Sequence, residues 1–277
     1  MAITAADVNK LRQQTGAGMM DCKKALVETD GDFEAAVDVL RKKGQKVAAK
    51  RGDNEAKEGV IFAQTTYDGK SGVVLKLNCE TDFVAKNDDF RSFVQSIVDI
   101  AISNMPANAD ALLALAYDDK LSVSEKITEQ IGVIGEKLEI SGLATVKADK
   151  VVAYNHPGNQ LASLVGLNMD GGDELAEAGR QVAMQVAAMN PIALNKDQVD
   201  AETISRELEV GKELAIQEGK PAEMAEKIAQ GRLNKFFKEN TLLSQSFVRD
   251  NKQTVEQFLN STQNGLTVIE YQRLSLS

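Results

Sequence analysis

Side chains able to perform covalent chemistry are few in this sequence, and they are not spaced as a catalytic site. Cys79 follows an apolar run, but no base that a thiol nucleophile needs can be identified. The one histidine, His156, precedes Pro157 in a turn, and helix capping explains the paired acids Asp88-Asp89. No metal-ligand spacing, phosphate-binding loop or nucleophile elbow occurs. The sequence predicts no catalytic residue, metal or cofactor, and a thiol enzyme using Cys79 is the alternative.

The stretch from Asn78 to Lys86 offers a different chemistry, the recognition of a partner. Phe83 stands between Asp82 and Lys86 in a short connection, after an expected strand at 73–77 and before an expected helix. Connections between elements face water, so a large aromatic residue placed in one often has a partner to meet. The alternative is that Phe83 folds back as a lid on the core.

An internal repeat bears on this choice. A strand, a turn, a second strand and a helix recur after Val151, so that Leu167-Asn168 corresponds to Leu77-Asn78. The first copy has about five more residues before its helix, and they fall in 81–86. An insertion present in only one copy is not needed to close the fold, which favours a functional role for Phe83.

Residues 1–54 are expected to form three short helices with a core of minimal size. Thr4 and Asp7 have capping-box spacing before the first helix, and the third helix is expected to end near Gly44. The segment Gly16-Ala17-Gly18 follows no strand and lacks a third glycine at the required spacing. It therefore predicts a tight interhelical turn rather than a dinucleotide-binding loop.

Two features of this segment have open interpretations. Met19 and Met20 are either core residues or an adaptable apolar contact surface. A basic run from Arg41 to Arg51 follows, and with ten basic and eight acidic residues the segment 1–54 has a net charge of +2. Because the run has no interleaved aromatic residues to stack on bases, we interpret it as a solvated helix end and a linker.

The rest of the chain predicts an α+β fold in which two related halves carry antiparallel sheets. The first half spans 55–149, and the second comprises 150–194 and 241–277. Residues 195–240 interrupt the second half as two helical runs joined by Gly219-Lys220-Pro221, an antiparallel helical hairpin. Its apolar stripe is more than a lone hairpin can bury, so it is expected to dock on a neighbour or, in a coiled-coil-like, dimerising role, on a second subunit.

Composition and charge disfavour several classes of protein. Of the 277 residues, 43% are hydrophobic and 26% are charged, as in ordinary globular proteins. The net charge of −9 argues against a general nucleic-acid or membrane-surface binder. The two cysteines make no disulfide framework, so we expect a protein of the reducing cytoplasm, and the N-terminus has no signal-peptide pattern. No apolar run approaches the roughly 20 residues of a membrane helix.

Two signature stretches resemble the elongation factor Ts family. The first joins Leu11-Arg12 to Thr15-Gly16-Ala17-Gly18-Met19-Met20-Asp21-Cys22-Lys23-Lys24-Ala25-Leu26, and the second is Asn78-Cys79-Glu80-Thr81-Asp82-Phe83-Val84-Ala85-Lys86. The resemblance continues through Tyr154-Asn155-His156, Val186-Ala187-Ala188, Gly219-Lys220-Pro221 and Ala225-Glu226-Lys227, and so covers nearly the whole chain. The end departs from the family pattern because 266–277 is short, and contacts made there by the family are not carried over.

The resemblance implies a guanine nucleotide exchange factor that binds elongation factor Tu, GDP-bound and nucleotide-free, during translation elongation. It implies a ubiquitin-associated-like three-helix domain at 1–54. The hairpin is expected either to form a homodimer or heterotetramer or only to extend the interface with the partner. It implies no direct contact with nucleic acid or membrane. The alternative is a scaffold whose three-helix module binds helical peptides, for which Phe83 would matter little.

The resemblance also assigns residues to the interface. Those expected to disturb the Mg²⁺ and phosphate site of the partner are Thr81, Asp82, Phe83 and Val84. Those expected to contact the nucleotide domain from the N-terminal helices are Arg12, Met19, Met20 and Lys23. His156, in the second half, is expected at the same interface or at an adjacent domain of the partner.

Overall fold

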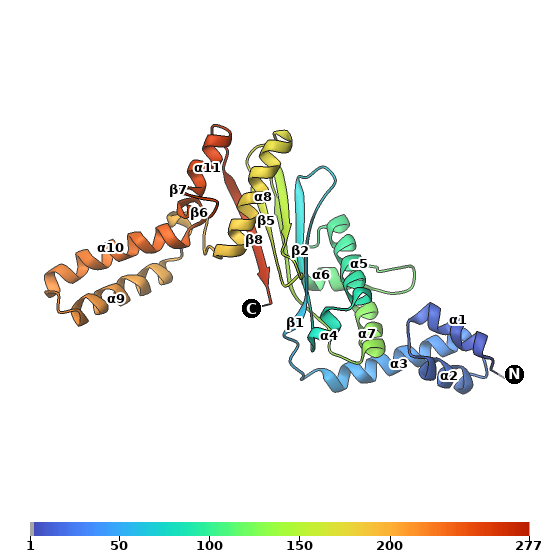
Figure 1. Ribbon diagram of the computed structural model, residues 1–277. Helices are drawn as coiled ribbons and strands as arrows, with labels where there is room; N and C mark the ends of the chain where they lie inside the picture. Colours follow the sequence, from blue (N-terminus) through green and yellow to red (C-terminus); the bar gives the residue numbers. More distant parts are fainter. Residues whose placement is uncertain (1–2, 277) are drawn as a thin grey trace.

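Two three-stranded antiparallel sheets lie face to face at the centre of the molecule, and helices cover their outer faces (Figure 1). The computed structural model describes residues 3–276 and confirms the predicted α+β class. The first sheet, of order β1-β2-β3, consists of β1 (Glu58–Thr65), β2 (Ser71–Cys79) and β3 (Glu139–Lys147). The second, of order β4-β5-β8, consists of β4 (Lys150–Asn155), β5 (Leu161–Leu167) and β8 (Val268–Ser275).

Alternation of side chains along the central strands explains this layering. In β2, Leu75 belongs to the core beneath the helices, whereas Val74 belongs to the core between the two sheets. In β5, Leu164 faces the first sheet and Val165 faces the helices of the second half. Each central strand is therefore apolar on both faces, which is why 73–77 has an almost continuous apolar sequence.

Helices cover the outer face of each sheet. Over the first lie α5 (Asp88–Asn104), α6 (Ala109–Ala114) and α7 (Val123–Ile134), and over the second lie α8 (Gly172–Met189) and α11 (Val255–Thr262). The apolar positions predicted for α5 are all buried: Phe90, Phe93, Val94, Ile97, Val98 and Ala101. The sequence did not predict α6, because its six residues are too few to display a helical period.

The two halves share an irregularity that supports the predicted repeat. Pairing of β2 with β3 shifts its register between Lys76 and Leu77, and pairing of β5 with β8 shifts between Gly166 and Leu167. Both shifts fall directly before the Leu-Asn pairs that correspond in the sequence. Only the first half has a short helix, α4 (Asp82–Ala85), between its central strand and its long helix.

An N-terminal module of three helices precedes the sheets. The helices are α1 (Ala5–Thr15), α2 (Met19–Glu28) and α3 (Phe33–Arg51). The predicted capping box opens α1: Thr4 Oγ1 accepts a hydrogen bond from Asp7 N, and the Asp7 carboxylate accepts one from Thr4 N. The most deeply buried side chains of the module are Leu11, Cys22, Leu26 and Ala36.

The prediction that the third helix ends near Gly44 is wrong, because α3 continues to Arg51. Gly44 lies where α3 crosses α7, and a Cβ on it would stand 2.9 Å from the carbonyl oxygen of Thr128. The facing Gly132 is equally confined, since its Cβ would stand 2.6 Å from Gly44 Cα. Gly44 therefore permits a close helix contact instead of a stop. The linker interpretation of the basic run is accordingly wrong as far as Arg51, which is helical.

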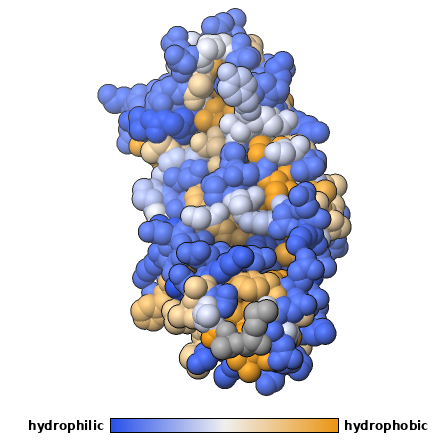
Figure 2. Space-filling model, turned by 90° about the vertical axis from the view of Figure 1, so that its right-hand side faces the viewer, coloured by the Kyte–Doolittle hydropathy of each residue, from blue (hydrophilic) through white to orange (hydrophobic). Residues whose placement is uncertain are grey.

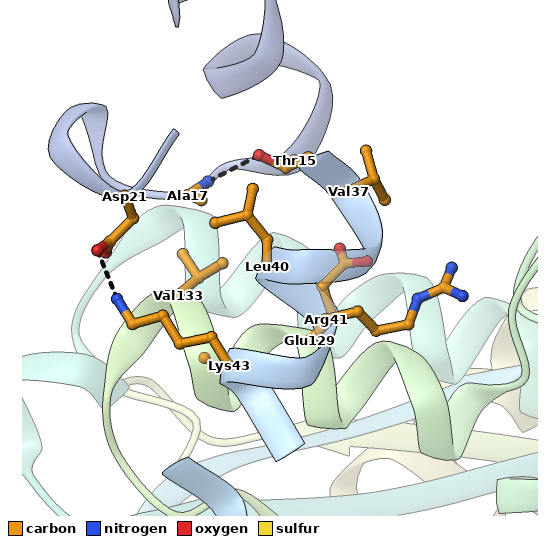
Figure 3. A pocket seen from close by; sticks show the side chains of 10 residues that line it. Thr15, Ala17, Asp21, Val37, Leu40, Arg41, Lys43, Glu129 and Val133 are labelled. Atoms are coloured by element: carbon orange, nitrogen blue, oxygen red, sulfur yellow. Dashed lines mark hydrogen bonds and ion pairs between the residues drawn. The ribbon is translucent and has the colours of Figure 1, made fainter. Parts of the chain in front are cut away.

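The contact of the N-terminal module with α7 is tightly filled. Figure 3 shows a hollow lined by Leu40 and Val133, with a 2.6 Å ion pair between Asp21 and Lys43 at its edge. The hollow has a volume of about 20 Å³, enough for roughly one water molecule. This hollow is too small to hold a nucleotide or a peptide, and the packing around it fixes the module on the body.

A helical hairpin, α9 (Ala201–Gln217) and α10 (Ala222–Asn240), projects from the body (Figure 1). The chain enters and leaves it at adjacent points, since Ile192 N donates to Asn240 O and Leu242 N donates to Ala193 O, each at 2.9 Å. Short elements complete the second half: η1 (Lys196–Gln198), η2 (Leu242–Ser244), β6 (Ser246–Phe247) and β7 (Asp250–Thr254). None of the described helices combines the length and the apolar character that crossing a membrane requires.

Candidate functional site

The Phe83 turn, defined as Thr81–Val84, stands between the end of β2 and the start of α5. Thr81 is the N-cap of α4, and its Oγ1 accepts a hydrogen bond from Val84 N at 3.4 Å. Asn87 is the N-cap of α5, and its Oδ1 accepts a hydrogen bond from Asp89 N at 2.7 Å. Two helix caps in quick succession fix the turn from both ends.

Phe83 points into solvent and is 83% exposed. The residues after it turn inward, since Val84 packs against the core of the first half and Ala85 is buried. The interpretation of Phe83 as a lid on the core is therefore wrong. Burying such a side chain would stabilise the protein by about 1.5–3 kcal/mol, and this free energy is left for a partner to gain.

Opposite charges frame the exposed ring. Lys86 Nζ donates a hydrogen bond to Asp82 Oδ2 at 2.6 Å, one helical turn away. This hydrogen bond lowers the pKa of Asp82 and raises the pKa of Lys86. Both groups lie at the surface, so the pair adds little to stability and remains accessible to a partner.

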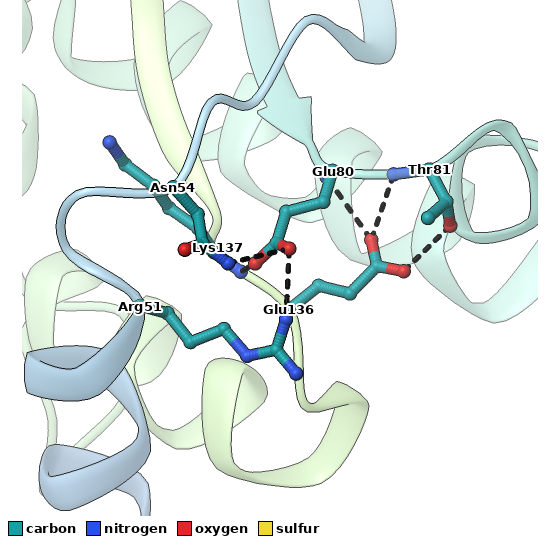
Figure 4. A network of polar contacts seen from close by, with 6 residues as sticks. All are labelled: Arg51, Asn54, Glu80, Thr81, Glu136 and Lys137. Carbon is teal, nitrogen blue, oxygen red and sulfur yellow. Dashed lines mark hydrogen bonds and ion pairs between the residues drawn. The ribbon is translucent and has the colours of Figure 1, made fainter.

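A polar network holds the base of the Phe83 turn (Figure 4). Glu136, between α7 and β3, accepts hydrogen bonds from Glu80 N at 3.1 Å and Thr81 N at 3.0 Å. Its other oxygen accepts from Thr81 Oγ1 at 2.6 Å. Glu80 Oε1 accepts in return from Lys137 N at 2.6 Å. Each carboxylate thus binds the backbone of the segment that carries the other.

The second oxygen of Glu80 ties the same turn to the end of α3. Arg51 Nη1 and Asn54 Nδ2 each donate to Glu80 Oε2 at 2.9 Å. Burial acts to raise the pKa of Glu80, but the hydrogen bonds from Lys137 N, Asn54 and Arg51 outweigh burial, so the pKa is lowered. Glu80 is therefore ionised at neutral pH, as an ion pair with Arg51 requires.

Cys79 lacks the properties of a nucleophile. Its side chain is fully buried, and Sγ donates to Thr81 O at 3.2 Å. Burial and the negative charge of Glu136 raise the pKa of the thiol to about 12. Because the thiolate is the reactive form, this thiol is inert at neutral pH, and the alternative of a thiol enzyme loses its basis.

The contact residues predicted for the N-terminal module lie on its surface. Met19 and Met20 are 57% and 62% exposed, so they are not core residues. Lys23, on the same helix, and Arg12, on α1, are exposed as well. Val27 is 57% exposed and extends the face of Met20 and Lys23, because it lies seven and four residues after them. The sequence analysis missed Val27, although helical spacing from Met20 signals it.

The surface around the N-terminal module combines apolar and charged side chains. Figure 2 shows the side of the molecule at the right of Figure 1 as mainly hydrophilic, with hydrophobic patches between the charged groups. Apolar side chains bordered by charged ones are typical of a surface that meets another protein, since the apolar groups supply contact area and the charges supply orientation.

His156 lies in the turn between β4 and β5, beside a hollow of about 410 Å³. Its Nδ1 is 2.9 Å from the Tyr154 hydroxyl, and the two rings meet edge to face with centroids 6.0 Å apart. The remaining lining is apolar: Leu161, Met184, Ala187, Ala188 and Val248. The sequence analysis missed Met184, whose spacing to Ala187 and Ala188 places all three on one face of a helix.

Of the three predicted contact surfaces, the structure brings two, the Phe83 turn and the turn that carries His156, to one edge of the body. Ile61 N, in β1, donates to Asn159 O at 2.7 Å, so the turn that carries His156 lies along this strand. Glu58, the first residue of the strand, pairs with Cys79 at the base of the Phe83 turn. The third surface is the methionine surface, formed by Met19 and Met20 on α2. It lies apart from this edge and is joined to it through α3.

Among residues 3–276, no group of three His, Cys, Asp or Glu side chains is placed to hold a metal ion. The exposed groups at the three surfaces are an aromatic ring, two thioethers and an imidazole beside a phenol. Side chains of these kinds supply contact area and hydrogen bonds to another protein.

Comparisons with known proteins agree with this geometry. A family model described as Elongation factor TS matches residues 80–277, which include the Phe83 turn, His156 and the hairpin. A protein named Elongation factor Ts from Cytophaga hutchinsonii is 50% identical over 275 residues, covering 99% of both chains. Proteins of the same name from Amoebophilus asiaticus and Porphyromonas gingivalis are 51% and 46% identical. The match to the Amoebophilus asiaticus protein covers 99% of both chains, and the match to the Porphyromonas gingivalis protein covers 100% of this chain and 99% of the other.

Proposed function

Because the chain belongs to the elongation factor Ts family, we propose that it is a guanine nucleotide exchange factor for elongation factor Tu. It binds the GDP-bound and nucleotide-free partner and promotes GDP release during translation elongation. One observation carries the proposal: an aromatic ring, Phe83, is 83% exposed on a doubly capped turn near the start of the stretch that matches the family.

The Phe83 turn acts as a wedge in the nucleotide domain of the partner. A GTPase holds its nucleotide through phosphate contacts and Mg²⁺, and Mg²⁺ requires nearly ideal octahedral ligands. Packed protein has no room for an additional ring, so insertion of Phe83 displaces the elements that support these ligands. Thr81 and Val84 fix the ring in position, and Asp82 brings a negative charge beside it.

Exchange requires that the factor bind the nucleotide-free partner more tightly than the nucleotide-bound one. By thermodynamic linkage, nucleotide then weakens the factor to the same extent, so incoming GTP displaces it. Each tenfold acceleration of release requires about 1.4 kcal/mol of barrier lowering. No covalent bond of either protein changes, so the activity is not that of an enzyme.

Two further surfaces complete the proposed interface. The residues that contact the nucleotide domain from the N-terminal module are Arg12, Met19, Met20 and Lys23. His156 contacts the same interface or an adjacent domain of the partner. The hairpin mediates a homodimer or heterotetramer through its exposed apolar side chains, which include Val210, Leu214, Ile216 and Met224.

The chain divides into parts that correspond to these surfaces. We assign 1–54 to the N-terminal module, 55–149 to the first half, 150–194 with 241–277 to the second half, and 195–240 to the hairpin. The protein works in the cytoplasm without direct contact with nucleic acid or membrane, since its contact surfaces are suited to protein.

Release of a fluorescent GDP analogue from purified elongation factor Tu tests the proposal. The release rate should rise with the concentration of this protein and then saturate, while release from an unrelated GTPase should not change. Calorimetry run in parallel shows whether the two proteins bind. Binding without any acceleration of release would overturn the exchange function.

A further inference from the structure

We propose that Glu80 and Glu136 are positioning residues that hold the Phe83 turn in its binding geometry and tie it to the end of α3. The inference deepens the proposed exchange function and rests on it. Neither glutamate touches the exposed ring. Glu136 acts through the backbone and the hydroxyl group of the segment from which the ring projects, and Glu80 ties that segment to Lys137 N, Arg51 and Asn54.

The hydrogen bonds of Glu136 lie where the sheet can no longer supply them. Cys79 is the last residue of β2 that pairs with β1, so Glu80 N and Thr81 N lie beyond the ladder. Glu136 accepts from both at 3.0–3.1 Å, which satisfies two backbone donors that a strand end leaves open. The inserted turn therefore depends on a carboxylate that arrives from a distant part of the chain.

A hydrogen-bonded chain leads from Glu136 to the residue next to Phe83. Thr81 Oγ1 donates to Glu136 Oε1 at 2.6 Å and at the same time accepts from Val84 N at 3.4 Å. The Glu136 carboxylate thereby orients the Thr81 hydroxyl so that a lone pair of Thr81 Oγ1 accepts the hydrogen bond that caps α4. Loss of the carboxylate frees the hydroxyl to rotate and loosens the first turn of the helix that presents the ring.

The second half provides an internal comparison. Leu167-Asn168-Met169-Asp170 corresponds to Leu77-Asn78-Cys79-Glu80, but no helix is inserted after it. The acid equivalent to Glu80, Asp170, makes only a 3.9 Å ion pair with Lys150 at the surface. The reciprocal carboxylates accompany the inserted turn, so we attribute them to the turn and not to closure of the sheet.

The network also joins the turn to the N-terminal module. Arg51 is the last residue of α3, and with Asn54 it holds Glu80. Lys137 Nζ donates to Gly52 O at 2.9 Å, which fixes the backbone directly after the helix. The end of α3, the base of the Phe83 turn and the start of β3 therefore form one rigid junction.

The test compares three variants in the GDP-release assay. Glu136→Ala removes both acceptor oxygens that bind Glu80 N, Thr81 N and Thr81 Oγ1. Glu136→Gln keeps an oxygen for the two backbone donors and an amide for Thr81 Oγ1. The control Glu139→Ala removes an exposed carboxylate three residues further on, which contacts only Lys137 Nζ at 3.2 Å in the structure. Maximal release at saturating protein is measured separately from affinity for nucleotide-free elongation factor Tu.

We expect Glu136→Ala to slow maximal release about tenfold, the change that 1.4 kcal/mol of barrier produces. Glu136→Gln should restore most of the rate, and Glu139→Ala should match the natural protein. Hydrogen exchange at the amides of 80–85 should quicken in the alanine variant only. A maximal rate unchanged by Glu136→Ala, or an equal loss in the control, overturns the inference.

A double-mutant cycle with Thr81→Val tests the route through the hydroxyl. If Glu136 acts through Thr81, the double variant is no slower than the slower single variant, whereas additive losses overturn that route. Circular dichroism establishes that each variant is folded. If the alanine variant is not, Thr81→Val keeps the test decisive, because it removes only the hydroxyl that Glu136 orients and should slow maximal release by itself. A natural protein that fails to accelerate release refutes the proposed function itself, and the exchange protection of 80–85 then still reports on the positioning.

Discussion

An aromatic ring kept in water gains nothing from the core, so the residues around Phe83 must prevent its turn from collapsing inward. Thr81 caps the short helix, Glu136 orients that cap, and Asp82 pairs with Lys86 one helical turn further on. These contacts determine where the ring projects before any partner arrives. A preorganised anchor loses little conformational entropy on binding, which is how one side chain comes to dominate an interface.

Phe83→Ala should leave the fold intact and slow nucleotide release. The ring is largely in solvent, so the melting temperature should stay within about 2 °C of that of the natural protein. Maximal GDP release should fall about tenfold or more, because a central aromatic anchor contributes at least about 2 kcal/mol. Tyr67→Ala removes another fully exposed ring, at the β1–β2 turn, and serves as the control. A release rate equal to that of the natural protein would reject the wedge.

Replacing Met19 and Met20 together by Ser should weaken partner binding without destabilising the protein. Both side chains are more than half exposed, so their removal creates no cavity in the module. Affinity for elongation factor Tu, measured by calorimetry, should fall about tenfold, while the thermal unfolding curve should stay nearly unchanged. Met189→Ser, another exposed methionine, should alter neither quantity. A large drop in melting temperature would show that the pair supports the core.

Glu80 should make stability depend on pH. Its hydrogen bonds lower its pKa in the folded protein below the value of about 4.3 of an unfolded chain. The ionised carboxylate therefore stabilises the fold above that value, and the contribution disappears as the pH falls through the lower folded pKa. The difference in unfolding free energy between the natural protein and Glu80→Gln should be constant near pH 7 and shrink below about pH 4. A difference that is the same at both ends of this range would contradict the linkage.

At the scale of elements, the sequence predicts strands, helices and the inserted turn, because each follows from local pattern. It does not predict features that depend on contacts between residues far apart in the chain. The end of α3 was misplaced because Gly44 destabilises an isolated helix by about 1 kcal/mol relative to Ala, and only its contact with Gly132 reveals why it is there. The pairing of Thr81 with Glu136 joins residues 55 positions apart and depends on the register of β2 with β3.

Gly132→Ala should destabilise the protein although alanine favours helix. A Cβ at this position would stand 2.6 Å from Gly44 Cα, so the helices must separate or shift. We expect the unfolding free energy to fall by about 1–3 kcal/mol in denaturant titrations. Gly231→Ala is the matched control in α10, where no atom lies within 4 Å of the new Cβ. It should gain up to about 1 kcal/mol, and equal gains at both sites would refute the close crossing.

At the scale of the whole molecule, the hairpin is an appendage whose removal need not disturb the sheets. The segments before and after it run side by side: Leu243 N donates to Leu194 O at 2.9 Å, and Ala193 and Thr241 form a parallel bridge. The core of the second half draws on α8, α11 and the strands, and its buried cluster includes no residue of α9 or α10. The core of the second half therefore does not depend on the hairpin.

Deleting 195–240 and joining the ends with a short Gly-Ser bridge should leave a folded protein that still promotes GDP release. Any self-association through the apolar stripe of the hairpin, which runs through Ile204, Leu208 and Ile228 and has Leu214, Ile216 and Met224 as exposed members, should disappear in sedimentation. The ends already lie together, so the bridge closes a short loop with little strain. Loss of exchange with an intact circular dichroism spectrum would mean that the hairpin touches elongation factor Tu productively.

In the proposed complex with elongation factor Tu, the continuous helix α3 makes the N-terminal module and the Phe83 turn two linked binding sites of one bivalent ligand. Its 19 residues measure about 28 Å at 1.5 Å per residue, and the helix is fixed to the body at Gly44 and again at Arg51. A flexible tether would lose entropy when both sites engage, whereas this spacer has lost that entropy on folding. Once the methionine surface is seated, the ring is presented at a high effective concentration, but only to a partner whose two receptor sites have the matching separation. Selectivity among GTPases then depends on distance as well as on side chains.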